Sequence, residues 1–112
     1  MKLVTAVVRP SRVDDVKEAL KAAGVLGMTV TEVQGFGRQL GHTEIYRGAE
    51  YKVDLIPKVK IEVLTDDESS HRIADAIAAA ARTDTVGDGK IWTTEVIGAV
   101  RIRTDERDSD AL

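Results

Sequence analysis

Hydrophobic residues recur along the chain with two spacings, and these predict four strands and two helices. After Pro57, valine and isoleucine alternate with lysine and glutamate over residues 58–63, which is typical of a strand with one face on a core. Residues 3–8 and 28–36 are rich in β-branched side chains and favour strands as well. A long final strand is expected over residues 91–102, where apolar side chains again share one parity.

Apolar residues three and four positions apart predict the two helices. The first is expected between Ser11 and Gly24, because serine can cap a helix start and glycine often ends a helix. The second is expected to include residues 73–81, with Asp66 or Asp67 as its cap. Each helix then presents one apolar stripe to a core.

The predicted order is strand, helix, strand, strand, helix, strand. This order indicates an α+β, ferredoxin-like βαββαβ fold, in which an antiparallel sheet carries two helices on one face. The other face lacks a cover, and residues 3–8 are apolar on both parities. We therefore expect one domain over residues 1–112 that assembles into an oligomer.

A long loop is predicted between the two middle strands, over residues 37–55. It shows no clear helical or strand period, whereas hairpin loops usually need only ~2 to 5 residues. The loop contains both tyrosines of the sequence, Tyr46 and Tyr51, which suggests recognition or modification. A flexible surface loop without function is the alternative.

Composition excludes several classes of protein. Sixteen basic against nineteen acidic residues give a net charge of -3, too balanced for a protein coated with nucleic acid. The sequence has no cysteine, which excludes disulfides and thiolate chemistry and suits a reducing cytoplasm. Residues 1–10 include Arg9 before any long apolar run, so they predict neither a signal peptide nor a membrane-spanning helix.

Two groups of residues are candidates for binding an anion. In Gly87-Asp88-Gly89-Lys90, glycines let main-chain N–H groups approach a phosphate, and the lysine adds a charge. An ordinary glycine turn is the alternative. Arg101 and Arg103 would lie on one side of the predicted final strand, about 7 Å apart, and could clamp a polyphosphate. Pairing with the acidic residues of 105–108 is the alternative there.

A third candidate pairs the two ends of the long loop. Lys58 at its end would lie opposite Gln39 at its start, so an ammonium and an amide can face one pocket that fits a carboxylate and a metal. A solvated strand lysine is the alternative. His42 and His71 lack the spaced partners of a zinc site, and His71 is expected on a helix surface. A phosphotransfer enzyme using either histidine, and a constitutive trimeric scaffold with a structural nucleotide, remain alternatives.

Four segments in this order and spacing resemble the PII signal-transduction family, which are trimeric nitrogen and energy sensors. They are Gly35-Phe36-Gly37-Arg38-Gln39, residues 46–51 (YRGAEY), residues 83–92 with Gly87-Asp88-Gly89-Lys90-Ile91-Trp92, and Arg101-Ile102-Arg103. The similarity runs nearly end to end. Asp84-Thr85 is a departure, because many relatives carry Gly-Lys there, and it puts nucleotide affinity in doubt.

The resemblance implies a non-catalytic homotrimer that binds ATP or ADP competitively in each cleft between neighbouring subunits. Residues 82–90 would form the nucleotide-binding loop, and Arg101 and Arg103 would reach in from the next subunit. The implied ATP/ADP-binding residues are Thr29, Gly35, Gly37, Arg38, Gln39, Glu62, Leu64, Gly87, Asp88, Gly89, Lys90, Arg101 and Arg103. Of these, Thr29, Glu62 and Leu64 would lie by the adenine.

The resemblance also implies a second ligand, 2-oxoglutarate. Gln39 would ligate a Mg²⁺ ion shared by the ATP phosphates and the 2-oxo acid group, and Lys58 would pair with the distal carboxylate. The implied 2-oxoglutarate-binding residues are Gln39, Gly41, Lys58 and Gly87. Because the metal needs the third phosphate, 2-oxoglutarate is expected to bind with ATP and poorly with ADP.

The implied output is a change in the long loop that alters which nitrogen-control proteins dock. These include ammonium transporters, glutamine-synthetase-modifying enzymes and transcription regulators, with Arg47 placed to plug a transporter pore. Tyr51 matches the tyrosine that an adenylyl- or uridylyltransferase modifies in some members. No nucleic acid is contacted directly, and a membrane only through the transporter. The tail, residues 104–112, is expected to be a frayed end, although it could order over bound nucleotide.

Overall fold

The computed structural model describes residues 1–37, 42–46, 49–53 and 55–112, and for residues 42–46 and 49–53 it describes the backbone. Two helices, six strands and two short 3₁₀ helices lie in these ranges. The strands are β1 (Lys2–Val8), β2 (Thr29–Gly35), β3 (His42–Tyr46), β4 (Ala49–Val53), β5 (Ile56–Thr65) and β6 (Lys90–Glu95). The helices are α1 (Val13–Ala22) and α2 (Ser70–Ala81), with 3₁₀ turns over Pro10–Arg12 and Asp108–Ala111.

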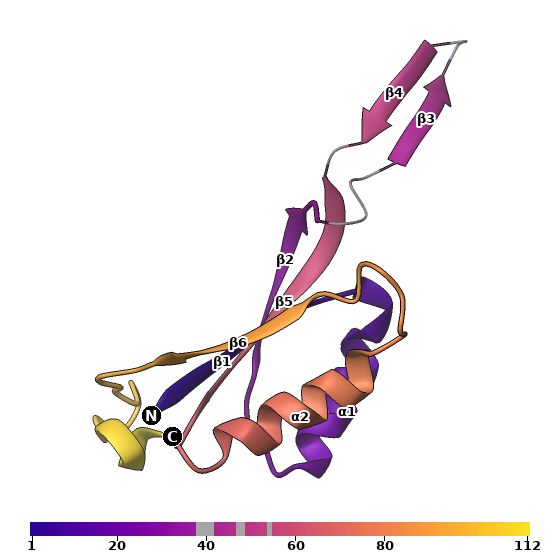
Figure 1. Cartoon of the computed structure of the whole chain (residues 1–112). Coiled ribbons are helices and arrows are strands. Elements are labelled where there is room, and N and C mark those ends of the chain that lie inside the picture. The colour runs from indigo at the N-terminus through magenta and orange to yellow at the C-terminus, as the bar shows by residue number, and fades with distance from the viewer. Residues whose placement is uncertain (38–41, 47–48, 54) are drawn as a thin grey trace.

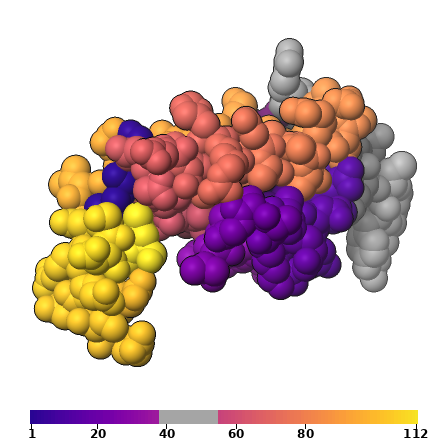
Figure 2. Space-filling view, turned by 90° about the horizontal axis from the view of Figure 1, so that it is seen from below, coloured from indigo at the N-terminus to yellow at the C-terminus, as the bar shows by residue number. Residues whose placement is uncertain are grey.

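The main sheet has four strands in the order β2-β5-β1-β6, and every neighbouring pair is antiparallel. Both helices pack on the same face of this sheet, and in Figure 1 none of the described elements covers the opposite face. In Figure 2 the two helices lie side by side, and the C-terminal residues form a lobe at one end of the chain. The predicted α+β, ferredoxin-like arrangement is confirmed.

The core lies between the sheet and the helices. Ala6 of β1 stands opposite Ile61 of β5 and Ile91 of β6, and this register fixes which side chains face the helices. Burial of each large side chain there stabilises the folded state by on the order of 1.5–3 kcal/mol relative to leaving it exposed. The core residues of the sheet and helices are Val4, Ala6, Val8, Val16, Leu20, Val59, Ile61, Val63, Ile73, Ile77 and Ala81. The alternation over residues 58–63 therefore predicted its strand correctly.

Both helix starts differ slightly from the prediction. The 3₁₀ turn Pro10–Arg12 precedes α1, so the α-helix begins at Val13 rather than at Ser11. α2 begins at Ser70 with Ser69 at its N-cap, so neither Asp66 nor Asp67 is the cap. The Asp66 carboxylate accepts hydrogen bonds from the Ser69 N–H at 2.8 Å and the Ser69 hydroxyl at 3.0 Å. These bonds lower the pKa of Asp66, and they hold the turn that starts the helix. The neighbouring Asp67 instead pairs with the Met1 amino group at 2.9 Å.

The final strand is shorter than predicted. β6 ends at Glu95 rather than continuing to residue 102, and beyond it Val100 and Arg107 make a single isolated bridge. The reason is the loss of a partner: β1 begins at Lys2, opposite Glu95, and the last bond between the two segments runs from the Val96 N–H to the Met1 carbonyl at 3.1 Å. Arg101 and Arg103 consequently do not share one side of a strand.

The long segment between β2 and β5 contains regular structure that the sequence did not predict. β3 and β4 form an antiparallel two-stranded sheet in which Ile45 lies opposite Glu50. This two-stranded sheet is separate from the main sheet, so its residues need not follow the apolar parity of the main core. β5 also begins at Ile56, one residue before Pro57. Because β1 pairs with β5 only as far as Val59, the proline leaves no bond to β1 unmade.

Candidate anion-binding site

Residues 82–90 connect α2 to β6 through a tightly turned loop. Asp84, Gly87 and Gly89 have positive φ angles of 64°, 103° and 98°. A Cβ atom built on Gly89 would lie 1.7 Å from the carbonyl oxygen of Val7, so the loop backbone rests directly on β1. This position needs a glycine both for its φ angle and for its space.

The Asp88 carboxylate holds the loop together from within. It accepts hydrogen bonds from the Thr83 N–H at 2.7 Å, from the Thr83 hydroxyl and from the Asp84 N–H at 2.9 Å. These contacts, led by the Thr83 hydroxyl, lower the pKa of Asp88 well below its usual range. The resemblance implies a nucleotide contact for Asp88, but its carboxylate is engaged by the loop itself.

Arg9, at the end of β1, completes this network. Its Nε donates to Asp88 Oδ1 at 3.1 Å, and its Nη2 donates to Thr85 Oγ1 at 2.8 Å and to the Val86 carbonyl at 2.6 Å. The sequence pattern did not predict this role for Arg9. Arg9 lies more than 70 residues before the loop along the chain, and no local pattern marks the pair; only the fold brings them together.

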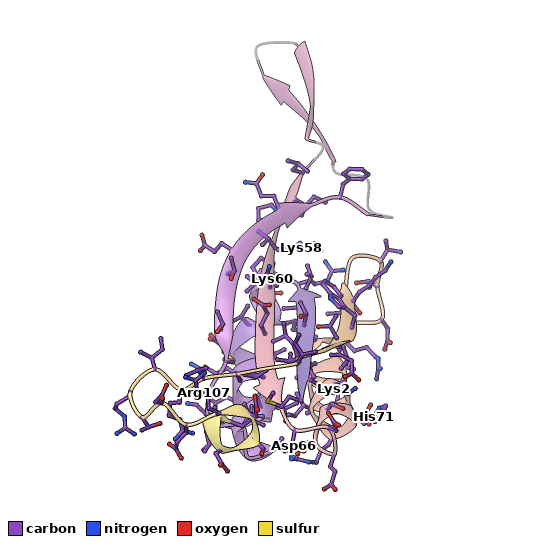
Figure 3. The ribbon with its side chains drawn as sticks, turned by 90° about the vertical axis from the view of Figure 1, so that its left-hand side faces the viewer. Lys2, Lys58, Lys60, Asp66, His71 and Arg107 are labelled. Carbon is purple, nitrogen blue, oxygen red and sulfur yellow. The ribbon has the colours of Figure 1, made fainter. Side chains whose placement is uncertain are left out.

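A hollow of about 610 Å³ lies beside the loop, on the helix-free side of the sheet. Lys58 of β5 lines it, and its Nζ donates to the Gly87 carbonyl at 2.7 Å. Burial lowers the pKa of Lys58, and the positive charge of Arg9 lowers it further. Figure 3 shows Lys58 and Lys60 on β5. The predicted site residues that line the hollow are Gly35, Gly37, Lys58, Gly87, Asp88, Gly89 and Lys90.

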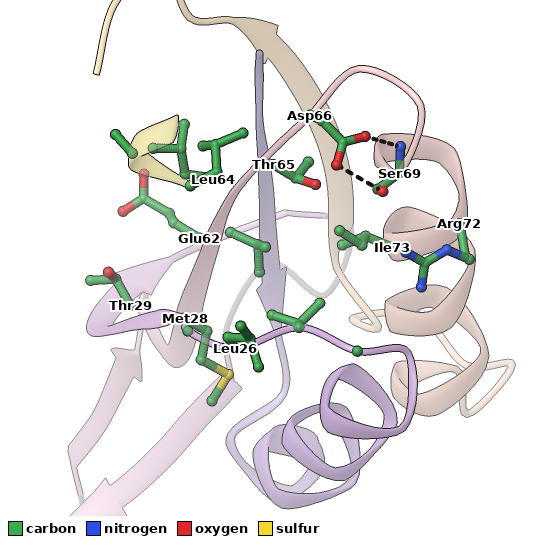
Figure 4. Close-up of a pocket in the computed structure, with 16 residues that line it drawn as sticks. Leu26, Met28, Thr29, Glu62, Leu64, Thr65, Asp66, Ser69, Arg72 and Ile73 are labelled. Atoms are coloured by element: carbon green, nitrogen blue, oxygen red, sulfur yellow. Dashed lines mark hydrogen bonds between the residues drawn. The ribbon is translucent and has the colours of Figure 1, made fainter. Parts of the chain in front are cut away.

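The residues implied for the adenine line a different hollow, of about 480 Å³ (Figure 4). Thr29 and Glu62 are directly paired across β2 and β5, and Leu64 follows on the same face of β5. Thr29 and Gly35 are the two ends of β2, so the two hollows are separated by roughly 20 Å along the strand. The implied nucleotide residues thus form two groups in one chain.

The predicted clamp of Arg101 and Arg103 does not form within the chain. Arg101 instead donates to Glu106 Oε1 at 3.0 Å and to the Leu112 main-chain oxygen at 2.8 Å, which is the alternative pairing with the tail. Arg103 is exposed, and neither arginine lines either hollow. The tail also makes the Val100–Arg107 bridge and a short 3₁₀ helix, so the predicted frayed end is wrong.

Several predicted residues lie outside the described part of the chain. Arg38, Gln39, Gly41 and Arg47 are among them, so the expected metal ligand and transporter contact stay predictions. Tyr51 lies in β4 opposite Glu44. His71 is exposed at the start of α2, as predicted.

Within residues 1–37, 42–46, 49–53 and 55–112, no cluster of three or more side chains suited to a metal occurs. None of the helices in this described part has the length and apolar character needed to cross a membrane.

Comparison with known proteins agrees with the fold and with the loop. Residues 1–106 match the family described as "Nitrogen regulatory protein P-II". The chain is 56% identical over 112 residues to the "Nitrogen regulatory protein P-II" of Cereibacter sphaeroides and 55% identical to that of Rhizobium etli, with each chain covered completely. It is 53% identical over 112 residues to the "Nitrogen regulatory protein P-II 1" of Escherichia coli K12, again over the whole of both chains. The chain therefore belongs to the nitrogen regulatory protein P-II family.

Proposed function

We propose that this nitrogen regulatory protein is a trimeric sensor that binds ATP or ADP and, together with Mg-ATP, 2-oxoglutarate. It is a regulator and not an enzyme, as its family membership implies. The observation that carries the proposal is the loop 82–90, whose glycine-dependent backbone lies beside a hollow lined by Lys58 and Lys90.

The chemistry of the hollow suits a polyphosphate. Main-chain N–H groups at glycines with positive φ can approach phosphate oxygens closely, because no Cβ intervenes. Lys58 and Lys90 add two cationic groups beside them. Burial and the charge of Arg9 lower the pKa of Lys58. An anion bound near Lys58 would therefore stabilise its charged form and offset the repulsion between Lys58 and Arg9.

Assembly into a trimer would complete the site. The phosphate residues and the adenine residues lie in two hollows at opposite ends of β2, so we infer that one nucleotide uses one group from each of two neighbouring copies. The helix-free face also exposes Leu64 (41%) and Trp92 (45%), which a second copy would cover.

Sedimentation equilibrium at micromolar concentration is expected to give a mass about three times the 12.1 kDa of the chain. Burial of the helix-free face of the sheet is the physical reason. A uniform population of single chains would contradict the trimer, and nucleotide binding by such chains would contradict the shared site.

Binding of 2-oxoglutarate is expected to require both Mg²⁺ and ATP. In isothermal titration calorimetry, heat should appear with Mg-ATP and be at least about tenfold weaker with ADP, because the metal would need the third phosphate. Gln39→Ala should abolish the heat, because the amide is the proposed metal ligand. Lys58→Met should weaken binding strongly, because a carboxylate would lose its charged partner.

Lys60→Met is the matched control for Lys58→Met. Lys60 lies two residues along on the same face of β5 and does not line the hollow. The Lys60→Met variant should bind 2-oxoglutarate with the affinity of the parent chain. Equal binding of 2-oxoglutarate with ADP and with ATP would contradict the coupling, and would leave a sensor of nucleotide alone.

The proposal extends to what the long loop does. Ligand binding through Gln39 would change the loop that contains β3 and β4, and with it the choice of nitrogen-control partner. We include an ammonium transporter contacted through Arg47, modification of Tyr51 by a nucleotidyltransferase, and a cytoplasmic location. The intact mass of protein purified from its own cells would reveal an attached nucleotide, and fragmentation of the peptide that contains Tyr51 would locate it.

A further inference from the structure

We propose that Arg9 is a positioning residue of the anion site, one that holds residues 83–88 in the shape that receives a phosphate. The inference rests on the proposed nucleotide function and adds to it a residue that would touch no ligand. Arg9 does not line the hollow, but it contacts three successive parts of the loop.

The guanidinium of Arg9 binds acceptors on Thr85, Val86 and Asp88. The side chains of Arg9 and Asp88 are each only 23% exposed, so their ion pair is partly shielded from water. Thr85 Oγ1 also lies 2.6 Å from Thr83 Oγ1, which extends the network to the beginning of the loop.

Negative groups of a loop that receives an anion repel it unless they are paired, and this loop contains the Asp88 carboxylate and the Val86 carbonyl. Arg9 binds both of these groups. It therefore offsets part of the negative charge that would repel a phosphate. The Asp84 carboxylate also lines the hollow, and the cations Lys58, Arg82 and Lys90 line it as well.

Arginine suits position 9 better than lysine would. A planar guanidinium donates from two nitrogens in fixed directions, whereas a lysine ammonium is a single point charge. The backbone of Arg9 is also fixed, because it follows β1 and its carbonyl accepts a hydrogen bond from the Arg12 N–H at 3.0 Å. A lysine at position 9 would keep the positive charge but lose some of the hydrogen bonds that Arg9 makes to the loop.

Arg9→Met and Arg9→Lys separate these roles. We expect Arg9→Met to weaken binding of ADP and Mg-ATP by on the order of tenfold, because the free loop must then be ordered by the ligand. Arg9→Lys should fall between Arg9→Met and the parent chain. In hydrogen exchange without ligand, the amides of residues 83–88 should exchange faster in both variants.

Arg107→Met is the matched control. Arg107 also pairs with an aspartate, Asp105 at 2.9 Å, but it does so in the tail. We expect parental affinity and parental exchange of residues 83–88 in this variant. Calorimetry measures the affinities, and thermal melting shows that each variant is folded.

The outcomes distinguish the inference from the proposed function. Parental affinity or parental exchange in Arg9→Met would overturn the positioning role, and full rescue of both by Arg9→Lys would overturn the role of the guanidinium geometry. If the parent chain binds neither nucleotide, the proposed function fails, and exchange of residues 83–88 still decides whether Arg9 orders the loop. If Arg9→Met does not fold, Arg9→Lys supplies the same comparison.

Discussion

Gly89→Ala is expected to destabilise the folded protein by on the order of 3 kcal/mol or more and to abolish nucleotide binding. The new Cβ would lie 1.7 Å from the Val7 carbonyl oxygen and 2.8 Å from its carbon. Both atoms belong to the backbone of β1, a strand paired on both sides, so neither can move without disturbing the sheet. The loop would have to lift away from β1, and the phosphate-binding backbone would move with it.

Gly24→Ala is the control that separates space from conformation. Gly24 also has a positive φ angle, 86°, but a Cβ there would meet nothing within 4 Å. This variant should cost only about 1 kcal/mol, which is the price of the backbone conformation alone. Urea unfolding at one fixed protein concentration measures both free energies, because assembly makes stability depend on concentration. Equal losses in the two variants would contradict the steric contact with Val7.

Asp88→Asn is expected to lower the melting temperature at pH 7 more than any exposed aspartate substitution. The carboxylate accepts from the Thr83 N–H, the Asp84 N–H and Arg9, and an amide would turn its NH₂ group toward one of these donors. Arg9 would also lose its anionic partner. Asp75→Asn is the control, because Asp75 is exposed on α2 and lies outside this network.

The loss of stability in Asp88→Asn should become smaller as the pH falls. The pKa of Asp88 is lowered in the folded protein, so its ionised form stabilises the fold at every pH above the ordinary aspartate value of about 3.9. This contribution is lost as the pH falls below that value toward the folded pKa. Melting curves of the parent and Asp88→Asn should therefore differ by a constant amount from pH 5 to 7 and converge below pH 4. A difference that grows on acidification would contradict the role of the carboxylate.

The sequence predicted the main sheet and both helices because their apolar residues face one core. Val59, Ile61 and Val63 alternate so regularly that only one register buries all three. The same dependence on a shared core explains why β3, β4 and the end of β6 were not predicted correctly. β3 and β4 form a separate two-stranded sheet, outside the main sheet whose residues face that core. The end of β6 depends on where β1 begins, which is a property of pairing rather than of residues 96–102.

Some residues of the candidate site could be predicted from local sequence, and others could not. Gly87, Gly89 and Lys90 could be recognised from their order alone, because glycines beside a lysine form a local anion-binding pattern. Arg9 could not, since its role depends on the strand end that lies under the loop. The sequence allowed two interpretations of Arg101, an anion clamp or pairing with the acidic tail. Within the single chain, Arg101 pairs with Glu106 of the folded tail.

Trp92 is the single tryptophan of the sequence, it lines the larger of the two hollows, and the residue is 45% exposed. Tryptophan fluorescence, excited where the two tyrosines do not absorb, thus reports one position beside the candidate site, without any label. A ligand in the hollow and a second copy on the sheet would both exclude water from the indole and shift its emission. Dilution separates the two signals, because a shift caused by association depends on protein concentration at constant ligand occupancy, whereas a shift caused by the ligand alone does not.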